Sequence, residues 1–518
     1  MEKYFYKDFN GAFNDASYAS NYTAKRGASP IPRRHSKIST LDEVMDVIED
    51  GDVISYPHYY RTGDKGLELV VQKLRQYGKK NICLYANAIF DHTEPWLQNA
   101  FRDGVLTSFY GNPYRKFGAF LMNGGLDQPS VGFSHGNRVR KLQTGEIKVK
   151  VAFGPVPMAD IHGNASGCLG DSKHWCGPLG LFLADAEYAD YVCLLTGDVS
   201  DRLLIPASIS MELVDFVVPV DCPGLAEGIG SGTLNIEKAR SNPFNAKIAE
   251  NVTKVMHAAE VIQDGFNFQV GSGAGLVVLD NIRQELRSRK IQANYAIGGI
   301  TSLHVDMYKE GLIDSLMHGQ LFEASDKVVS SLYNDAKHVE ISTGYYASVA
   351  GKEAAVNMLD VAVLSALELD LEFNVNTVCA NGRIIGGIGG GQDVAAGADL
   401  TIMFLPLATG KNGKGFPKVV EKVYTKTTPG EVIDVVVTED YVVVNPNSKS
   451  TKKNILIERA KEFGLNIIDI ETLHDFSIKK AKEFGVLPIL TEVTDRVIHY
   501  IEWRDGTLLD KIYQPFVK

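Results

Sequence analysis

Short apolar runs alternate with amphipathic stretches along most of the chain. The runs DVISY, NICLY, VKVAFGPVP and YVCLLT predict buried strands, whereas GLELVVQKLRQYG and TEPWLQNAFRDG have the apolar spacing of helices. The second half repeats the pattern, with FNFQV and the nearly continuous apolar run LDVAVLSALEL as strands. Strands that alternate with helices pair in parallel through crossovers, so the pattern predicts a layered α/β fold.

The two halves also share a sequence signature. Residues 151–164 read VAFGPVPMADIHGN and residues 361–374 read VAVLSALELDLEFN, so both begin with Val-Ala and later carry Asp and Asn at equal spacing. We infer an internal duplication that produced two related α/β domains. The predicted organisation is an N-terminal arm (1–40), a first domain (41–230) and a second domain (231–518), which includes a small C-terminal α+β extension of helices and a hairpin.

Composition narrows the class of protein. The chain has 518 residues and a net charge of −10, with 45% hydrophobic and 22% charged residues, as in an ordinary folded protein. The acidic balance argues against nucleic acid or an anionic membrane as the main partner. The N-terminus does not resemble a signal peptide, and no apolar run reaches the ~18 residues of a membrane helix, so we expect a cytoplasmic protein.

The cysteines give no sign of a metal or a disulfide framework. The six cysteines are scattered without a CxxC pair, and we expect reduced thiols. Cys168 and Cys176 lie close to His162 and His174 in the sequence, but their spacing matches no usual zinc pattern. We therefore expect no metal site.

Three glycine clusters in the second half are the main candidate chemistry, each near the end of a predicted strand. Backbone amides in such loops approach a ligand closely and stabilise negative charge, which suits a phosphate or a thioester oxyanion. Neither GxxxxGK[ST] nor a GxGxxG with a following acid is present. The candidate residues for binding a thioester are Gly271, Ser272, Gly273, Gly275, Gly298, Gly299, Thr301, Gly387, Gly389 and Gly390.

Candidate cations lie in the first half and candidate acids in the second. His58 and Arg61 in SYPHYYRTGD, with His135 and Arg138 in FSHGNRVR, are the predicted receivers of a carboxylic acid, because a guanidinium matches a carboxylate. Glu340 and Glu368 lie beside apolar strand-like runs, where a carboxylate needs a partner or a function. The alternative for each is an ordinary surface or strand-end side chain.

Several longer motifs together resemble the citrate lyase alpha subunit (citrate CoA-transferase) family. They are FSHGNRVRKLQTGEIKVKVAFGPVPMADIHGNASG, FQVGSGAGLVVLDNI, YAIGGIT, HVEIS, LSALELDLEFNVN and TDRVIHYIEWRDG, in that order from about residue 50 to the C-terminus. The resemblance implies two domains of the CoA-transferase type. It also implies exchange of the acetyl group of acetyl-acyl carrier protein or acetyl-CoA for citrate, which gives a citryl thioester and acetate.

The resemblance implies partners and a mechanism as well. No tightly bound cofactor is expected; the thioester would be carried by CoA or by a dephospho-CoA-type prosthetic group on an acyl carrier protein. A citryl lyase subunit and a homo-oligomer are also expected. Related enzymes use a covalent glutamate, but Gly298 stands at the matching position, so we predict direct transfer through a mixed anhydride. If a covalent glutamate exists, Glu340 is the first candidate and Glu368 the second.

The chain departs from the family pattern at three positions, namely Pro57, Asn137 and Gln392, where histidines or a glycine would be expected. These positions lie where the acid is predicted to bind, so they bear on the identity of the acceptor rather than on thioester exchange. Two alternatives remain: a stand-alone CoA-transferase that uses another carboxylic acid, and a non-catalytic scaffold subunit.

Overall fold

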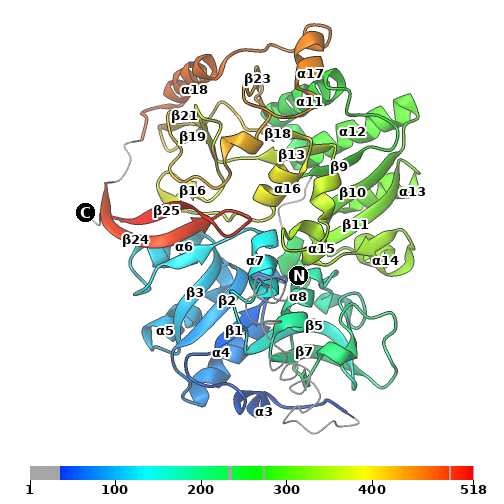
Figure 1. The fold of residues 1–518 in the computed structure, drawn as a ribbon, viewed down its shortest axis with the longest axis vertical. Helices are drawn as coiled ribbons and strands as arrows, with labels where there is room; N and C mark the ends of the chain where they lie inside the picture. The colour runs from blue at the N-terminus through cyan, green and yellow to red at the C-terminus, as the bar shows by residue number, and fades with distance from the viewer. Residues whose placement is uncertain (1–35, 231–235, 272–274, 489–491, 517–518) are drawn as a thin grey trace, which may run out of the picture.

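Each half of the chain builds its own parallel sheet, as the repeated pattern predicts (Figure 1). The structure, a computed structural model, describes residues 36–230, 236–271, 275–488 and 492–516. The first sheet has the order β4 (Ser130–Gly132), β3 (Leu106–Pro113), β2 (Ile82–Ile89), β1 (Val53–Tyr56), β5 (Val151–Asp160), β7 (Tyr191–Ser200) and β8 (Phe216–Pro219). The strands that the sequence predicts as DVISY, NICLY, VKVAFGPVP and YVCLLT are therefore β1, β2, β5 and β7.

The second sheet repeats the strand order of the first. It runs β12 (His338–Glu340), β11 (Ile313–Leu321), β10 (Ala293–Ile300), β9 (Asn267–Val270), β13 (Val361–Ser365), β18 (Leu400–Phe404) and β22 (Val435–Val437), and ends with the antiparallel β23 (Val442–Val444). Each strand named above for the first sheet thus has a counterpart at the same place in the second sheet. This repetition is what a duplicated ancestor predicts, and it confirms a fold of two related layered α/β units.

The shared Asp and Asn of the signature make the same turn in both halves. Asp160 accepts hydrogen bonds from the Asn164 backbone N–H (3.0 Å) and side-chain amide (2.8 Å), and Asp370 accepts the same pair from Asn374 (2.9 and 3.2 Å). Both asparagine side-chain oxygens then accept a distant backbone N–H, that of Met211 in the first half and of Gly430 in the second. The repeated residues therefore fix one local geometry twice.

Helices cover the two sheets, and some pack on other helices or on shorter strands instead. Their bounds are α3 (Leu41–Met45), α4 (Gly66–Gln76), α5 (Trp96–Arg102), α6 (Arg115–Met122), α7 (His135–Gln143), α8 (Gly180–Tyr188), α9 (Glu227–Gly230), α10 (Ile236–Ser241), α11 (Pro243–Ala258), α12 (Gly275–Arg289), α13 (Ser302–Lys309), α14 (Asp326–Asn334), α15 (Thr343–Ala347), α16 (Gly391–Gly397), α17 (Lys453–Arg459) and α18 (Ile470–Phe484). One buried apolar cluster includes residues of both halves, for example Leu194 and Val278, so apolar burial joins the two units.

Short strands and turns complete the fold. The remaining strands are β6 (Ala165–Ser166), β14 (Glu368–Asp370), β15 (Val375–Asn376), β16 (Cys379–Ala380), β17 (Arg383–Ile384), β19 (Ala408–Lys411), β20 (Lys414–Pro417), β21 (Val419–Val420), β24 (Val493–Glu502) and β25 (Leu508–Pro515). The run LDVAVLSALEL, predicted as one strand, is two: β13 ends at Ser365, and β14 pairs in a separate small sheet with β15 and β21. An unbroken apolar pattern does not show where a chain changes sheets.

The C-terminal hairpin forms at Asp505-Gly506, as predicted, but it does not complete the second half. Strand β24 pairs in parallel with β4, so β24 and β25 extend the first sheet at its edge (Figure 1). Alternation of polar and apolar residues defines a strand without defining the sheet that it joins, which explains the wrong prediction.

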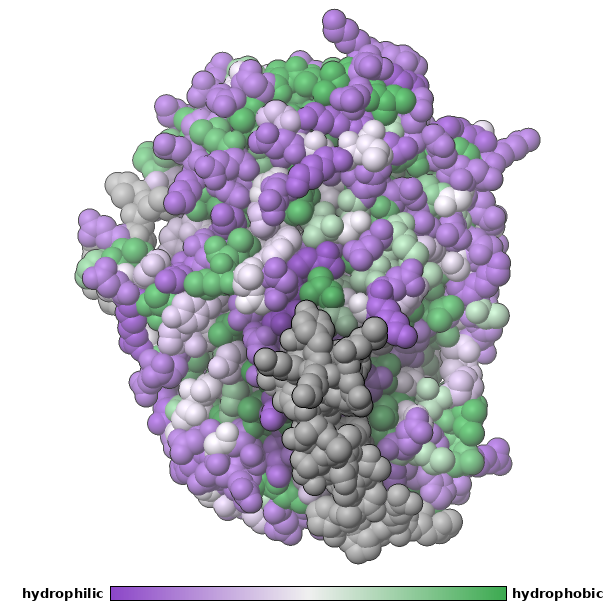
Figure 2. Space-filling model, in the orientation of Figure 1, coloured by the Kyte–Doolittle hydropathy of each residue, from purple (hydrophilic) through white to green (hydrophobic). Residues whose placement is uncertain are grey.

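The visible face of the molecule is polar, as expected for a folded protein with an apolar interior. The face drawn in Figure 2 is mostly hydrophilic, with apolar residues in small scattered groups. Among the helices of the described residues, none combines the length and the apolar character needed to cross a lipid bilayer.

Candidate active site

A cavity of about 240 Å³ lies at the carboxyl ends of five neighbouring strands of the second sheet. The ends of β9, β10, β11, β13 and β18 contribute to its wall, and residues near the start of α16 and in α15 close it. His135 of α7 and Leu181 of α8 reach the cavity from the first unit. Ligands of open parallel sheets bind at this edge of the strands, so the cavity is the candidate active site.

The predicted glycines line the cavity where side chains would fill it. Gly271, Gly298, Gly299, Gly387 and Gly390 are all part of its wall. A β-carbon at Gly299 would lie 2.2 Å from the Phe322 ring, and one at Gly390 would lie 2.8 Å from the Tyr346 hydroxyl. Gly298 has a φ of 97°, which disfavours any residue with a β-carbon. The clusters are therefore needed for room as well as for backbone geometry.

Three other predicted residues of the glycine clusters are described but are not part of the cavity wall. Gly275 begins α12, and Thr301 lies at the start of α13, where its hydroxyl contacts His304 Nδ1 at 3.0 Å. Gly389 lies beside the cavity wall, because its carbonyl accepts the backbone N–H of His135 at 3.0 Å. Ser272 and Gly273 lie outside the described residues.

His135 is the predicted acid-binding residue that reaches the cavity. Its Nδ1 lies 2.9 Å from Asn87 Oδ1, and Ser134 caps its helix by accepting the N–H of Asn137. Burial, helped by the nearby charges of Arg138 and Arg61, lowers the pKa of His135 to about 4. The imidazole is thus neutral at physiological pH and offers a hydrogen bond rather than a charge.

Arg61 lies at the margin of the same cavity. Its guanidinium stacks on the ring of Phe322, 5.1 Å from the ring centroid, and Nη1 donates to the carbonyl of Ile229 at 2.9 Å. Phe322 lines the cavity, so the positive charge of Arg61 lies directly behind the Phe322 ring. The structure therefore brings Arg61, His135 and the glycines together from different units.

Arg138 and His58 lie elsewhere. Arg138 is fully buried, and its two terminal nitrogens each donate to Asp185 at 2.7 Å, so the predicted carboxylate partner is one of the chain's own side chains. His58 is 1% exposed and packs edge-on against the rings of Tyr56 and His92. Both buried positions correct the expectation that these side chains receive an external acid.

The two candidate glutamates are held by polar contacts away from the cavity wall. Glu340 accepts hydrogen bonds from Ser208 Oγ (2.6 Å) and the Leu179 backbone N–H, both from the first unit, and burial raises the pKa of its carboxyl. Glu368 accepts from the Asn376 side-chain amide at 2.8 Å. Among the described residues that line the cavity, none carries a carboxylate.

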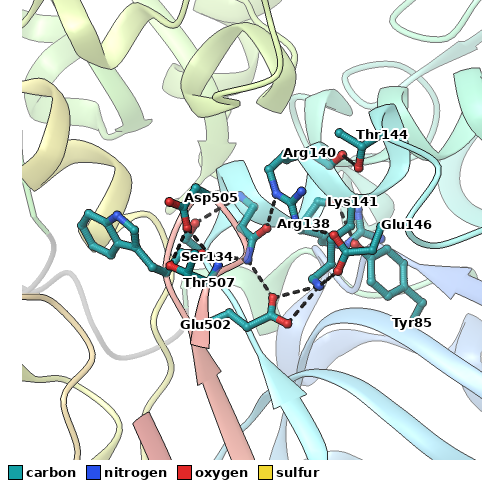
Figure 3. Close-up of polar contacts among 12 residues, drawn as sticks. Tyr85, Ser134, Arg138, Arg140, Lys141, Thr144, Glu146, Glu502, Asp505 and Thr507 are labelled. Atoms are coloured by element: carbon teal, nitrogen blue, oxygen red, sulfur yellow. Dashed lines mark hydrogen bonds and ion pairs between the residues drawn. The ribbon is translucent and has the colours of Figure 1, made fainter. Parts of the chain in front are cut away.

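The departures at Asn137 and Gln392 have a common structural role. Asn137 Nδ2 donates to Glu502 and to the Trp503 carbonyl, both at 2.9 Å, and Gln392 Nε2 donates to the Glu502 carbonyl at 3.0 Å. Lys141, which lies on α7 together with Asn137, forms an ion pair with Glu502 at 2.8 Å (Figure 3). These residues fasten the C-terminal hairpin to α7 and α16, so they lie behind the cavity wall.

Sequence reasoning missed several polar or aromatic residues of the wall, of which four contribute a side-chain amide or an aromatic ring. Gln269 and Gln320 lie near the ends of β9 and β11, Phe322 follows β11, and Tyr346 lies in α15, where its hydroxyl bonds Gln269 at 3.0 Å. The two glutamines had a detectable signal: each is a polar residue at the end of a buried strand. Tyr346 had none, because its position depends on how α15 packs.

Comparison with known proteins agrees with this architecture. Residues 35–515 match the family described as "Citrate lyase, alpha subunit (CitF)". The chain is 38% identical over 493 residues to the citrate lyase alpha chain of Klebsiella pneumoniae, covering 94% of this chain and 93% of that protein. A solved alpha subunit of citrate lyase from Streptococcus mutans, in complex with citrate, has a TM-score of 0.87 at 35% identity and covers 94% and 93% of the two chains.

A more distant structure shows the fold alone. The 4-hydroxybutyrate CoA-transferase of Porphyromonas gingivalis has a TM-score of 0.52 at 16% identity, covering 86% of this chain and 98% of that one. The two units are thus of the CoA-transferase type. Since the family match spans residues 35–515 and the curated relative is similar over 93% of its length, this chain belongs to the citrate lyase alpha-subunit family.

Proposed function

We propose that this chain is a citrate CoA-transferase, which exchanges the acetyl group of an acetyl thioester for citrate. The observation that carries the proposal is the cavity, where glycines from three clusters leave room beside a neutral imidazole and an arginine. Such a site accommodates the slender pantetheine arm of a thioester together with a small acid. Membership of the citrate lyase alpha-subunit family supports citrate as that acid.

Two acyl transfers give the products. A carboxylate oxygen of citrate attacks the acetyl carbonyl, the C–S bond breaks, and the thiolate leaves behind an acetyl–citryl anhydride. The thiolate then attacks the citryl carbonyl of the anhydride, and acetate leaves with the electron pair of the broken C–O bond. Backbone amides near the glycines would stabilise the oxyanion of each step. The cavity would hold the acetyl group, the citrate and the thiolate together.

We assign the acid to the side of the cavity formed by Arg61 and His135. A guanidinium stacked on an aromatic ring keeps its charge, which would attract a carboxylate at this end of the cavity. The neutral His135 would donate or accept a hydrogen bond at the same end. The thioester would enter along Gly271, Gly298 and Gly299, carried by CoA or by a dephospho-CoA-type group on an acyl carrier protein.

The family supports a multisubunit setting, for which we propose an acyl carrier protein and a citryl lyase subunit as partners and a homo-oligomer of this chain. The activity itself needs neither partner when CoA replaces the carrier. A purified chain incubated with acetyl-CoA and citrate should therefore form citryl-CoA and acetate, detected by mass spectrometry. If another acid reacts and citrate does not, that acid is the acceptor. If CoA binds but no acid is exchanged, the chain is a scaffold subunit.

Direct transfer makes a separate prediction about the protein. Because no described residue of the cavity wall has a carboxylate, acetyl-CoA alone should leave no acyl group on the chain. Intact-mass analysis after incubation with acetyl-CoA, followed by hydroxylamine treatment, should give the mass of the unmodified chain throughout. A glutamate nucleophile would instead displace the CoA thiolate to form an acetyl–glutamyl anhydride, which the thiolate converts into a glutamyl-CoA thioester with release of acetate. A hydroxylamine-sensitive adduct of the mass of CoA that disappears in Glu340→Gln, but persists in Glu368→Gln, would identify Glu340 as that nucleophile.

A further inference from the structure

Two histidines and an aspartate meet at the carboxyl edge of the first sheet, away from the cavity wall. His58 lies in the loop after β1, His92 lies in the 3-10 helix η2 (Asp91–Thr93) after β2, and Asp64 follows the 3-10 helix η1 (Arg61–Gly63). One nitrogen of each imidazole and one oxygen of the carboxylate all lie within 4.8 Å of one another. Since β1 and β2 are adjacent and parallel, their ends place these loops together.

The imidazole nitrogens of His58 and His92 lack hydrogen-bond partners in the part of the chain that the structure describes. None of the four ring nitrogens of His58 and His92 has a hydrogen-bond partner of good geometry among the described residues, although the Arg61 backbone lies near the His58 ring. His58 is 1% exposed, packed between the rings of Tyr56, Phe90 and His92. A buried nitrogen without a partner is costly, so the cluster is suited to a ligand that binds through nitrogen lone pairs.

The carboxylate is oriented and lacks a buried counter-charge. Tyr56 Oη donates to Asp64 Oδ2 at 2.7 Å and the Leu67 backbone N–H donates to Oδ1 at 3.1 Å, which leaves a lone pair on each oxygen. Burial raises the pKa of Asp64 to about 7, and the charged groups that act on this cluster are the exposed Lys65 and, beside His92, Asp91. A bound cation would provide the missing positive charge within the protein.

The donor atoms of the cluster, two imidazole nitrogens and one carboxylate oxygen, indicate which metal ions would bind. Neutral imidazole is the form that binds metal ions. Two nitrogens and one oxygen are ligands for zinc, iron or cobalt rather than for magnesium or calcium, which prefer oxygen.

We propose that His58, His92 and Asp64 form a binding site for one divalent transition-metal ion, with Zn²⁺ as the expected occupant and Tyr56 orienting the carboxylate. Tetrahedral ligands at Zn–N distances of about 2.0–2.1 Å lie roughly 3.3 Å apart, so side-chain shifts of about 1 Å would close the set. Water would complete the coordination. The ion would tie the β1 loop, which carries Arg61, to the β2 loop; its role is structural, and its binding does not require the proposed transferase activity.

The test uses the full-length chain without an affinity tag, in a buffer that contains no citrate because citrate binds metal ions. After chelation and dialysis, Co²⁺ is titrated as a spectroscopic substitute for Zn²⁺, and bound metal is measured by absorption and by mass spectrometry of metals. We expect one ion per chain and an increase in the thermal unfolding midpoint. Failure to bind one ion per chain would overturn the proposal.

Variants locate the ion. His92→Ala should weaken Co²⁺ binding by at least about 100-fold, since even the loss of a partner behind a ligand costs 10–100-fold. Cys222→Ser tests the neighbouring Cys222–His174 pair, whose Sγ and Nδ1 lie 3.9 Å apart, and His474→Ala tests a histidine on the distant α18. Both should bind as the parent does. Retained binding in His92→Ala, or loss in Cys222→Ser, would overturn the assignment.

A second measurement avoids substitution of a buried cluster. Co²⁺ is paramagnetic and shifts the ring-proton NMR signals of an imidazole that it binds, even where the ring nitrogens are buried. In the unmodified sequence, Co²⁺ should shift the ring signals of His92 strongly but leave those of His474 unchanged. Unshifted His92 signals at saturating Co²⁺ would contradict the proposal even if His92→Ala does not fold.

Discussion

Arg138→Met should lower the free energy of unfolding by about 3–5 kcal/mol, as is typical when one partner of a buried ion pair is removed. The guanidinium is 1% exposed and makes two hydrogen bonds of 2.7 Å to the Asp185 carboxylate, which is fully buried. It also lies over the Tyr85 ring, 4.9 Å from the centroid (Figure 3). Methionine retains much of the apolar contact but leaves a buried charge without its partner. Denaturant unfolding measures the loss.

The double variant Arg138→Met/Asp185→Leu is the matched control, because it removes both charges together. It should recover most of the lost stability, and Arg115→Met, at a side chain 74% exposed, should change stability little. The sequence-based prediction was that Arg138 binds the acid. That prediction would hold if Arg138→Met folds with parental stability and raises only the KM for citrate.

The sequence predicted the residue type at Arg138 but not its partner. Arg138 and Asp185 are 47 residues apart, and no local pattern indicates that α7 and α8 bring them together. Asp185 lies in the run GPLGLFLADAEYADYVCLL, where an acid beside apolar residues is compatible with a helix face in water or with burial. Which of the predicted cations face the cavity therefore depends on contacts between residues that are far apart in the sequence.

Local chemistry was more informative wherever the backbone itself decides the structure. The glycine clusters were located at strand ends from the sequence, because a strand, a glycine turn and a helix follow one another along the chain. The Asp-Asn signature indicated a duplication, and the structure adds that the shared residues make the same turn in both halves. The hairpin turn at Asp505-Gly506 was predictable for the same reason, whereas its pairing with β4 was not, since β4 lies far away in the sequence.

Gly299→Ala should reduce kcat/KM for acetyl-CoA by about 100-fold, equivalent to roughly 2.7 kcal/mol of transition-state stabilisation. The new β-carbon would lie 2.2 Å from Phe322 Cε2, so the ring must leave its position. Phe322 both lines the cavity and supports the Arg61 guanidinium, so its displacement disturbs the thioester side and the acid side together. Steady-state kinetics with each substrate varied in turn measures the effect.

Gly319→Ala provides a matched control on the neighbouring strand β11. Gly319 also lines the cavity, but the nearest atoms to a β-carbon there lie 3.9 Å away, at ordinary contact distance, so activity should fall much less. The cause is tested in the Phe322→Ala background, where the ring that clashes is gone. There Gly299→Ala should have little further effect, because two substitutions that act through one contact are not additive. An undiminished 100-fold loss in that background would show that Gly299 acts through the substrate rather than through Phe322.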